Sequence, residues 1–438
     1  MLPIACFAVG CCLASVAVPA AQTTENHQIK LSLNRENGIY RKGETVQLSI
    51  RCQSNGKPAE KPLQITIFQQ DGTKKTEQLK AGEKTFSYPL QNGAVRFTVS
   101  AMGEDGKVIR QGNGKKKKAL SASIGAIAAP EEIQPFFQEP ADFQQFWDHA
   151  LAELAKVPVK ASRKEVDPPR NQQGKFKSWD VQVDCAGNAP VSGYLTMPVN
   201  AAPKSLPAVV SFQGAGVHSG WNLIIPGAIH FNINAHGIAN GQPKEFYLNL
   251  RKNELAGYQR RNADDREKFY FRNMFLRVKR ALDYVKTLPE YDGKTLIVQG
   301  GSQGGAQAIV ASGLDPDVVL IGAQVPAMCD HGGILAGRRS GWPQLIRLKN
   351  GKPVNSAIVK TLPYYDMAFF AKRIKAEAYF TAGLIDTTCC PSSVYAVYNC
   401  IPGKKEMFAM PDKGHLGTLS PGFLKRRQEL IRAAAAKK

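Results

Sequence analysis

The segment Gly300-Gly301-Ser302-Gln303-Gly304-Gly305 constrains the fold of this chain more than any other part of its sequence. It follows the apolar, β-branched run Leu296-Ile297-Val298 and precedes residues 306–310, whose composition is typical of the start of a helix. A G-x-S-x-G motif between a strand and a helix forms a tight, strained turn, and glycine is needed beside the serine because larger side chains would clash. The motif therefore predicts a serine whose Oγ is exposed above the end of a sheet.

An exposed serine becomes an effective nucleophile only with a histidine base and an acid that orients this histidine. A strand, a G-x-S-x-G turn and a helix are typical of α/β-hydrolases, in which the partners follow in the order Ser, Asp or Glu, His. His331 and His415 are the two histidines after Ser302, and His331 comes too early to leave room for a strand that carries the acid. His415 lies in a polar, glycine-containing loop after the apolar segment 407–410. We therefore predict His415 as the base.

The acid is predicted to be Asp386. Residues 378–383 have the composition of a strand, and Asp386 follows the end of this strand. Asp412 is the competing carboxylate, but it lies three residues before His415 and has no strand of its own. The alternative is an Asp386 that caps a loop and a His415 that lies on the surface. The chain order favours a triad of Ser302, Asp386 and His415 over this alternative.

Several segments around these residues resemble the acetyl xylan esterase and cephalosporin C deacetylase family of α/β-hydrolases. They are the elbow with Gln303 after the serine, Tyr365-Asp366, Gly383-Leu384-Ile385-Asp386, the run from Pro391 to Asn399, and the entry helix from Pro140 to Trp147. The resemblance spans residues 139–432. It implies hydrolysis of acetyl esters on sugars, with Ser302, Asp386 and His415 as the triad.

Two positions depart from the pattern of this family. The family usually has Arg-Gly-Gln after its third strand, where this chain has His236-Gly237-Ile238. It has His-Glu at the base, where this chain has His415-Leu416. Both changes leave the triad intact and indicate a divergent member. The substrate range and assembly of the family are not carried over, although a homo-oligomer is compatible with the sequence.

An oxyanion hole can be placed by the same logic, because a tetrahedral intermediate needs two preorganised N–H donors. One donor is the backbone N–H of Gln303, the residue after the nucleophile. The other is expected in the small-residue loop 213–216, which follows the apolar strand 208–212. The resemblance implies that Ala215 supplies this N–H, and an ordinary turn is the alternative.

Three further residues lie on loops at the carboxyl ends of strands, where open α/β sheets bind ligands: His218, Trp221 and His236. We single out Trp221 and His236 as substrate-binding candidates, Trp221 by stacking on a sugar ring; packing or surface roles are the alternatives. His230 lies in an apolar strand and is expected to be a core histidine. The sequence shows no zinc-ligand spacing, P-loop or G-x-G-x-x-G order, so we predict neither a metal nor any other cofactor.

The remaining sequence predicts further parts before the catalytic domain of residues 139–438. Residues 1–20 are apolar and rich in small residues, which is typical of a signal peptide, so we expect export to the periplasm or the extracellular medium. Residues 28–123 contain short alternating segments separated by Asn-Gly and Asp-Gly turns, which predict a β-sandwich of the immunoglobulin-like kind. Residues 124–138 are predicted to be the linker. The segment 328–358 is expected to form a cap over the pocket.

Composition limits the partners. Lys and Arg number 57 against 36 Asp and Glu, which gives a net charge of +21, but no nucleic-acid-binding motif accompanies this charge. We therefore predict no nucleic-acid partner, and no run beyond the first 20 residues is apolar enough to span a membrane. Six cysteines follow the predicted signal peptide, and a bridge from Cys389 or Cys390 to Cys400 competes with buried free thiols.

The sequence thus predicts an exported serine esterase that removes O-acetyl groups from an oligosaccharide or polysaccharide through an acetyl-enzyme intermediate. The fold class is α/β, an α/β-hydrolase domain with a mostly parallel sheet and helices on both faces, preceded by a small all-β sandwich. Two alternatives stay open: a serine hydrolase of other esters or peptides, and a non-catalytic polysaccharide-binding protein.

Overall fold

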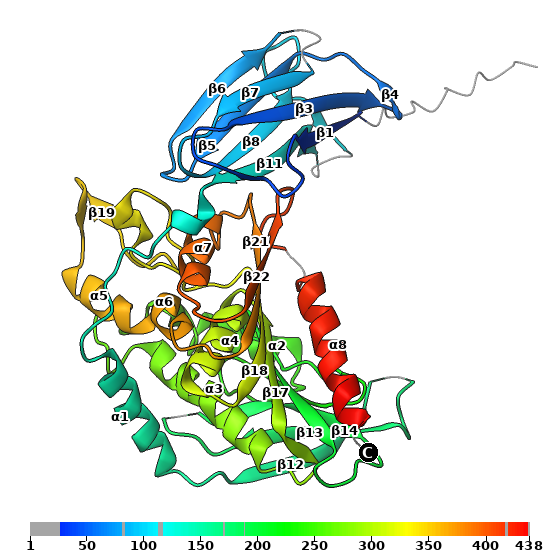
Figure 1. Ribbon diagram of the computed structural model, residues 1–438, viewed down its shortest axis with the longest axis vertical. Coiled ribbons are helices and arrows are strands. Elements are labelled where there is room, and N and C mark those ends of the chain that lie inside the picture. Colours follow the sequence, from blue (N-terminus) through cyan, green and yellow to red (C-terminus); the bar gives the residue numbers. More distant parts are fainter. Residues whose placement is uncertain are drawn as a thin grey trace, which may run out of the picture.

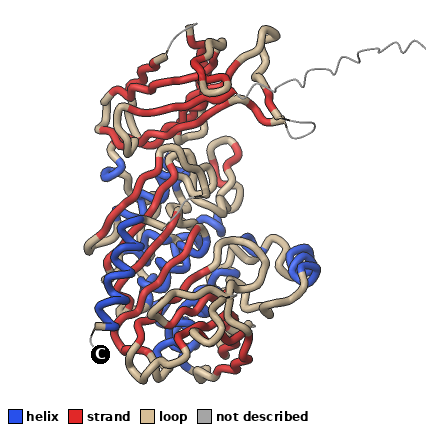
Figure 2. The backbone as a smooth tube through the Cα atoms, turned by 90° about the vertical axis from the view of Figure 1, so that its right-hand side faces the viewer, coloured by secondary structure: helices blue, strands red, loops and turns tan. Residues whose placement is uncertain are grey.

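The computed structural model describes residues 27–80, 84–112, 117–169, 171–187, 189–416 and 419–436. The predicted signal peptide, residues 1–20, lies outside this part of the chain. Two bodies are stacked along the long axis of the molecule, an all-β body at the N-terminal side and a larger body with a central sheet covered by helices (Figures 1 and 2). The predicted fold class is confirmed.

The N-terminal body is a sandwich of two sheets. The first sheet contains β1 (His27–Leu33), β3 (Thr45–Ser54), β4 (Lys57–Pro58) and β7 (Thr85–Pro89). The second has the order β2 (Ile39–Tyr40), β11 (Ser121–Ala128), β8 (Gly93–Ala101), β5 (Leu63–Gln69) and β6 (Lys74–Leu79), and β9 (Arg110–Gln111) pairs with β10 (Lys118–Ala119) outside both. The alternating segments that predicted strands, residues 29–33, 45–50, 63–67 and 95–99, lie in β1, β3, β5 and β8.

Alternation along each strand builds the core of this sandwich. In β8 every second residue is buried, including Val95, Phe97 and Val99. They meet Val46 and Leu48 of β3 from the facing sheet in one apolar cluster. A strand period of two places all these side chains on one face, so the sequence pattern itself specifies which face is buried.

The predicted linker boundary is wrong. Strand β11 runs from Ser121 to Ala128 and pairs along its length with β8, so residue 124 lies inside a strand. The short 3₁₀ helix η2 (Pro130–Glu132) follows, and the side-chain amide of Asn399 donates hydrogen bonds of 2.8 Å to the carbonyls of Pro130 and Ile133. This part of the chain is therefore fixed on the catalytic domain.

The catalytic domain is built on one nine-stranded sheet with the order β12-β13-β14-β16-β15-β17-β18-β21-β22. The bounds are β12 (Ala161–Val166), β13 (Phe176–Val183), β14 (Val191–Pro198), β15 (Leu206–Phe212), β16 (Ile229–Ile233), β17 (Tyr291–Gly301), β18 (Val318–Gln324), β21 (Glu377–Gly383) and β22 (Lys405–Met410). Strands β15, β16, β17, β18, β21 and β22 run parallel to one another, whereas β12, β13 and β14 pair antiparallel with their neighbours. The carboxyl ends of the parallel strands therefore lie at one edge, where the site is found.

Helices cover both faces of this sheet (Figure 1). The elements are α1 (Phe143–Ala155), α2 (Lys244–Lys252), η3 (Tyr258–Arg260), α3 (Tyr270–Lys286), α4 (Gln303–Leu314), α5 (Ser356–Thr361), η5 (Leu362–Tyr365), α6 (Met367–Ala371), α7 (Pro391–Asn399) and α8 (Pro421–Ala435). Successive residues of β17 point to opposite faces. Leu296 and Val298 join the large core with α3 and α4, whereas Ile297 packs with Phe423 and Ile431 of α8.

The segment 328–358 carries η4 (Gly333–Ala336) and the hairpin of β19 (Leu348–Lys349) and β20 (Lys352–Pro353). It packs on the loop of the predicted acid, because the Trp342 N–H donates to the Thr388 carbonyl at 2.8 Å. The six described cysteines are free, so neither Cys389 nor Cys390 is bridged to Cys400. No helix within the described ranges has the length and apolarity needed to cross a bilayer.

Candidate active site

Ser302 lies at the turn between β17 and α4, with φ 55° and ψ −123°. This is a sparsely populated backbone conformation for a residue with a side chain. Three backbone hydrogen bonds hold it: the Ser302 N–H donates to the Gln324 carbonyl at 2.9 Å, and its own carbonyl accepts from Ala306 and Ala327 at 3.1 and 3.0 Å. The turn is the strained elbow that the motif predicts.

The glycines of the motif are needed because backbone packs against them. A Cβ on Gly300 would lie 2.3 Å from the Gly304 carbonyl oxygen, and one on Gly304 would lie 2.2 Å from the Phe212 carbonyl oxygen. Real Cβ atoms do not approach backbone so closely. The elbow is thus pressed against the end of β15, which brings the following loop to the serine.

The three residues of the predicted triad meet at this edge of the sheet. His415 Nε2 lies 2.9 Å from Ser302 Oγ, and His415 Nδ1 lies 2.9 Å from Asp386 Oδ2. A carboxylate can only accept, so Nδ1 carries the proton and Nε2 of the neutral ring accepts from the serine hydroxyl. The other carboxylate oxygen accepts the N–H groups of Thr388 and Cys389 at 2.7 and 3.0 Å. The Asp386 side chain is fully buried, whereas that of His415 is 31% exposed.

Two adjacent loops carry the acid and the base. Asp386 follows β21 and His415 follows β22, and these strands pair in parallel. The Leu384 N–H donates to the Met410 carbonyl at 2.9 Å and the Ile385 N–H to the Lys413 carbonyl at 3.2 Å. A Cβ on Gly383 would lie 2.4 Å from the Gly414 carbonyl oxygen, so the loops are in close contact there. This packing fixes the position of His415 relative to Asp386.

The loop 213–216 lies beside the nucleophile, as expected for an oxyanion hole. A Cβ on Gly214 would be 3.4 Å from the Gly301 carbonyl oxygen and 3.9 Å from Ser302 Cβ. The Gln307 side chain, on α4, donates to the Gln213 carbonyl at 2.9 Å. Ala215 is exposed and Gln303 is buried. Both predicted donors are therefore on segments that border Ser302.

The predicted contact of His236 with substrate is wrong. His236 is 3% exposed, and both ring nitrogens are occupied. Nε2 donates to the Gly216 carbonyl at 3.0 Å, and Nδ1 accepts from the Tyr270 hydroxyl at 2.7 Å. Burial, reinforced by the charge of Arg277, lowers the pKa of His236 to about 3. This neutral histidine therefore fixes the loop 213–216 through its hydrogen bond to the Gly216 carbonyl.

Trp221 is accessible, with 50% of its surface exposed. Its ring stacks on the His218 ring with 5.6 Å between centroids and 15° between planes. It also borders a cavity of about 260 Å³ whose lining includes Gly300 and Gly301, the residues before the nucleophile. His230 is buried, as expected, and binds Ser211 and the Leu223 carbonyl.

Two residues of the site, Tyr258 and Cys389, were not predicted from the sequence to lie beside the nucleophile. The Tyr258 hydroxyl donates to the Gln303 side-chain carbonyl at 2.6 Å and so orients the residue after the nucleophile. Cys389 is 1% exposed; burial raises the pKa of its thiol well above the ordinary value, and the Ser302 hydroxyl opposes part of this rise. No spacing in the sequence links these residues to Ser302, because the contacts form between segments distant in the chain.

Within the described residues, the potential metal ligands Asp386, Cys389 and His415 converge, with their ligand atoms within 4.8 Å of one another. The hydrogen bond between Asp386 and His415 already accounts for two members of this group. The arrangement can transfer a proton from Ser302 Oγ to His415 and stabilise the resulting imidazolium with the buried carboxylate. These are the requirements of acyl transfer by a serine nucleophile.

Comparisons with known proteins agree with this geometry. The acetyl xylan esterase family, described as Acetyl xylan esterase (AXE1), matches residues 130–428. Acetyl esterase Axe7A of Xylanibacter ruminicola is 30% identical over 398 residues, which cover 89% of this chain and 87% of that protein. Residues 130–438 make up less than 89% of the chain, so the similarity to Axe7A extends into the region of the sandwich.

Solved structures are similar to the catalytic domain. Acetyl xylan esterase from Paenibacillus sp. R4 is 27% identical with a TM-score of 0.57, covering 69% of this chain and 98% of that one. Acetyl Xylan Esterase 1 from Thermoanaerobacterium sp. is 26% identical with a TM-score of 0.58, covering 70% and 97%. These similarities make the protein a carboxylic ester hydrolase. With the fold and the matched segment in agreement, the chain belongs to the acetyl xylan esterase family, as a divergent member.

Proposed function

We propose that this protein is an exported serine esterase that removes O-acetyl groups from carbohydrate. The observation that carries the proposal is the continuous hydrogen-bonded chain from Ser302 Oγ through His415 to Asp386, with both distances at 2.9 Å. The family membership supports the acetyl ester as the bond that is broken.

In the proposed reaction, Ser302 Oγ attacks the acetyl carbonyl carbon while His415 Nε2 accepts the hydroxyl proton. The tetrahedral intermediate collapses, and His415 donates this proton to the departing sugar oxygen, which leaves as a hydroxyl. A water molecule then attacks the acetyl-serine, with His415 Nε2 accepting its proton. His415 returns this proton to Ser302 Oγ as the bond to the acetyl carbon breaks, which releases acetic acid and restores the serine. Asp386 stays ionised and stabilises the imidazolium in each half of the cycle.

The negative oxygen of the intermediate would be held by the backbone N–H groups of Gln303 and Ala215. Such donors stabilise the transition state because charge develops there, and one of them typically contributes about 3–4 kcal/mol. The support is structural: the Gln303 side chain is fixed by Tyr258, and the loop of Ala215 is fixed by Gln307 and His236.

Trp221 is the proposed contact for the sugar. An exposed indole ring offers an apolar face that a pyranose can cover. Its position beside a cavity that reaches Gly300 and Gly301 would place a stacked sugar near the nucleophile. Export is proposed from residues 1–20 alone, and the N-terminal sequence of the protein recovered from a producing culture tests it.

Hydrolysis of 4-nitrophenyl acetate by the full chain tests the proposal. Ser302→Ala should lower kcat on the order of 10⁴-fold or more, because the loss of a catalytic serine leaves only oxyanion stabilisation and binding. Ser312→Ala is the matched control, since Ser312 lies on the helix that follows Ser302, and its buried hydroxyl has no hydrogen-bond partner in the described ranges. Equal rates for Ser302→Ala and wild type would refute the mechanism.

The substrate class needs a separate panel. Acetylated xylo-oligosaccharides should be deacetylated faster than 4-nitrophenyl butyrate or octanoate is hydrolysed, and peptides should not be cleaved. Faster turnover of the longer acyl esters or of peptides would reject sugar deacetylation while keeping the serine mechanism.

A further inference from the structure

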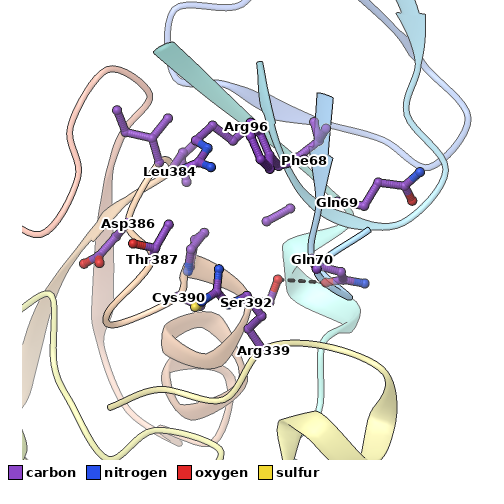
Figure 3. A pocket seen from close by; sticks show the side chains of 15 residues that line it. Phe68, Gln69, Gln70, Arg96, Arg339, Leu384, Asp386, Thr387, Cys390 and Ser392 are labelled. Carbon is purple, nitrogen blue, oxygen red and sulfur yellow. Dashed lines mark hydrogen bonds between the residues drawn. The ribbon is translucent and has the colours of Figure 1, made fainter. Parts of the chain in front are cut away.

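A cavity of about 80 Å³ lies between the two domains, behind the loop of Asp386 (Figure 3). Its sandwich wall comes from the ends of β5 and β8, including Phe68 and Arg96. Its catalytic wall comes from Arg339, the acid loop and the first residues of α7. A single water molecule needs roughly 10–15 Å³ by the same measure, so the cavity can hold a group larger than water.

Two guanidinium groups line this cavity, one from each domain. Arg96 lies over the Phe68 ring at 4.1 Å, which fixes its side chain, and its buried Nε has no hydrogen-bond partner among the described residues. Burial and then the positive charge of Arg339 lower the pKa of Arg96. The Arg339 backbone is fixed at both ends, since its N–H donates to the Gln70 carbonyl at 2.9 Å and its carbonyl accepts from the Ser393 hydroxyl at 2.9 Å.

No carboxylate in the described part of the chain serves as a counter-ion for this pair of arginines. Among the described residues, neither Arg96 nor Arg339 forms an ion pair with Asp or Glu. Asp386 is the carboxylate in the lining, and its oxygens already accept from His415, Thr388 and Cys389. Two like charges that face one partly enclosed space repel each other, and this repulsion is relieved when an anion lies between them.

Neutral groups complete the lining. Burial raises the pKa of the Cys390 thiol to about 11, so it stays uncharged. The Ser392 hydroxyl, in the first turn of α7, donates to the Gln70 side chain at 2.8 Å across the domain boundary (Figure 3). The positive end of the α7 dipole adds to the field of the two arginines.

We propose that this interdomain cavity binds a small oxyanion, a carboxylate or a phosphate group, between Arg96 and Arg339. Guanidinium groups hold such anions through charge-assisted, paired N–H donors. The bound anion joins a side chain of the sandwich to one of the catalytic domain and so stabilises their contact. The site is separate from the oxyanion hole at Ser302, and its occupancy is independent of whether the proposed triad is correct.

Titration distinguishes two sources of the bound anionic group, a free phosphate and a sugar carboxylate. Isothermal titration of the full chain with sodium phosphate and with sodium glucuronate, at constant ionic strength in chloride, compares a free phosphate with the carboxylate of an acidic sugar. Arg96→Gln and Arg339→Gln should each weaken binding of the preferred anion by at least about tenfold, because each removes one charged donor. Arg163→Gln is the matched control, since Arg163 also lies over an aromatic ring, that of Tyr284, at 5.3 Å.

The site is supported if Arg163→Gln keeps the wild-type affinity and both Arg96→Gln and Arg339→Gln lose affinity. The anion that binds wild type more tightly, phosphate or glucuronate, then identifies the chemical source of the ligand. Arg339 is exposed and its side chain forms no hydrogen bond with the described residues, so Arg339→Gln tests the site even if Arg96→Gln fails to fold. Absence of binding by both anions in wild type, or equal affinity in wild type and both variants, overturns the proposal.

Discussion

Ser302 combines an unfavourable backbone conformation with the position that the proposed chemistry needs. A residue with a side chain in such a region costs about 1–3 kcal/mol, which the surrounding structure must offset. Three backbone hydrogen bonds offset this cost. The Ser302 N–H donates to the Gln324 carbonyl, and the Ser302 carbonyl accepts from the N–H groups of Ala306 and Ala327. The strain keeps Oγ directed at His415, because relaxation of the turn would break these bonds.

The two glycines before Ser302, Gly300 and Gly301, differ in how tightly their surroundings pack, and this difference can be measured. Gly300→Ala should lower the melting temperature by several degrees, because its Cβ would be 2.3 Å from a backbone oxygen and overpacking costs about 1–3 kcal/mol. Gly301→Ala should have a much smaller effect, since its Cβ would meet the flexible end of Gln324 at 3.3 Å. Thermal unfolding of both variants measures the difference, and equal melting temperatures would contradict the packing argument.

Single residues differed in how well the sequence predicted them. The places of Ser302, Asp386 and His415 followed from chain order, because each lies on the turn or loop that follows its own strand. His236 was assigned to substrate from its position after a strand, but its ring is turned inward to Tyr270 and Gly216. Such contacts join segments far apart in the chain, and no local pattern reports them.

The loop 213–216 illustrates how neighbouring elements position a reactive group. It has no regular structure of its own, and it is held by Gln307 from α4 and by His236 after β16. Both bonds end on backbone carbonyls of the loop, so they leave its N–H groups available to an oxyanion. This is the arrangement that a preorganised donor loop requires.

Loosening this loop should affect turnover more than binding. Gln307→Met removes the bond to the Gln213 carbonyl and leaves a buried acceptor unpaired, a loss of about 1–3 kcal/mol. We expect kcat on 4-nitrophenyl acetate to fall about tenfold, with a smaller change in KM. Ser312→Ala on the same helix is the control. A change confined to KM would show that the loop acts on ground-state binding.

Elements with strong periodicity were predicted well. The strands β1, β3, β5 and β8 of the sandwich lie where the alternation of apolar and polar residues indicated. The end of the sandwich was misjudged because the Ala-rich part of β11 lacks this alternation. Residues 124–128 are all buried, since Gly125 packs against Leu384 of the acid loop in addition to the sandwich core.

The two domains meet at the loop that carries Asp386. The Gly125 N–H donates to the Pro411 carbonyl at 2.8 Å, and a Cβ on Gly125 would be 2.3 Å from the Leu384 carbonyl oxygen. The sandwich therefore supports the acid and base loops from outside the catalytic domain. The cavity between Arg96 and Arg339 belongs to the same contact, and it could not be predicted because its walls come from four distant segments.

Disturbing this contact should reduce activity at a distance. Gly125→Ala would displace the backbone of Leu384 and with it Asp386, and a shift of about 1 Å in a catalytic group can cost about 10²-fold in rate. Gly403→Ala is the control, because a Cβ there has no atom within 4 Å. Circular dichroism should show both variants folded. Wild-type kcat in Gly125→Ala would show that the sandwich does not support the acid loop.

Buried histidines should make the folded protein sensitive to acid. Burial lowers the pKa of His331 to about 4, whereas the unfolded chain has the ordinary value of 6.5. The unfolded state therefore binds the proton first, and stability present above pH 6.5 is lost as the pH falls towards 4. Burial lowers the pKa of His230 to about 4 as well.

His331→Leu removes one of these groups. Between pH 6.5 and 5, the free energy of unfolding should fall by about 2 kcal/mol less in this variant than in wild type. Urea unfolding at both pH values measures this difference, with a variant of the exposed His149, His149→Gln, as control. Identical pH dependence in wild type and His331→Leu would contradict the assignment of a neutral buried histidine.

The central claim is that Ser302 is the nucleophile of an ester hydrolase. Peptide mapping by mass spectrometry, after the folded protein reacts with a fluorophosphonate, tests it most directly, because this reagent forms a stable adduct with an activated serine. We expect one adduct, on the peptide that contains Ser302, and its loss in His415→Ala. No adduct in wild type, or an adduct on another serine, would contradict the account.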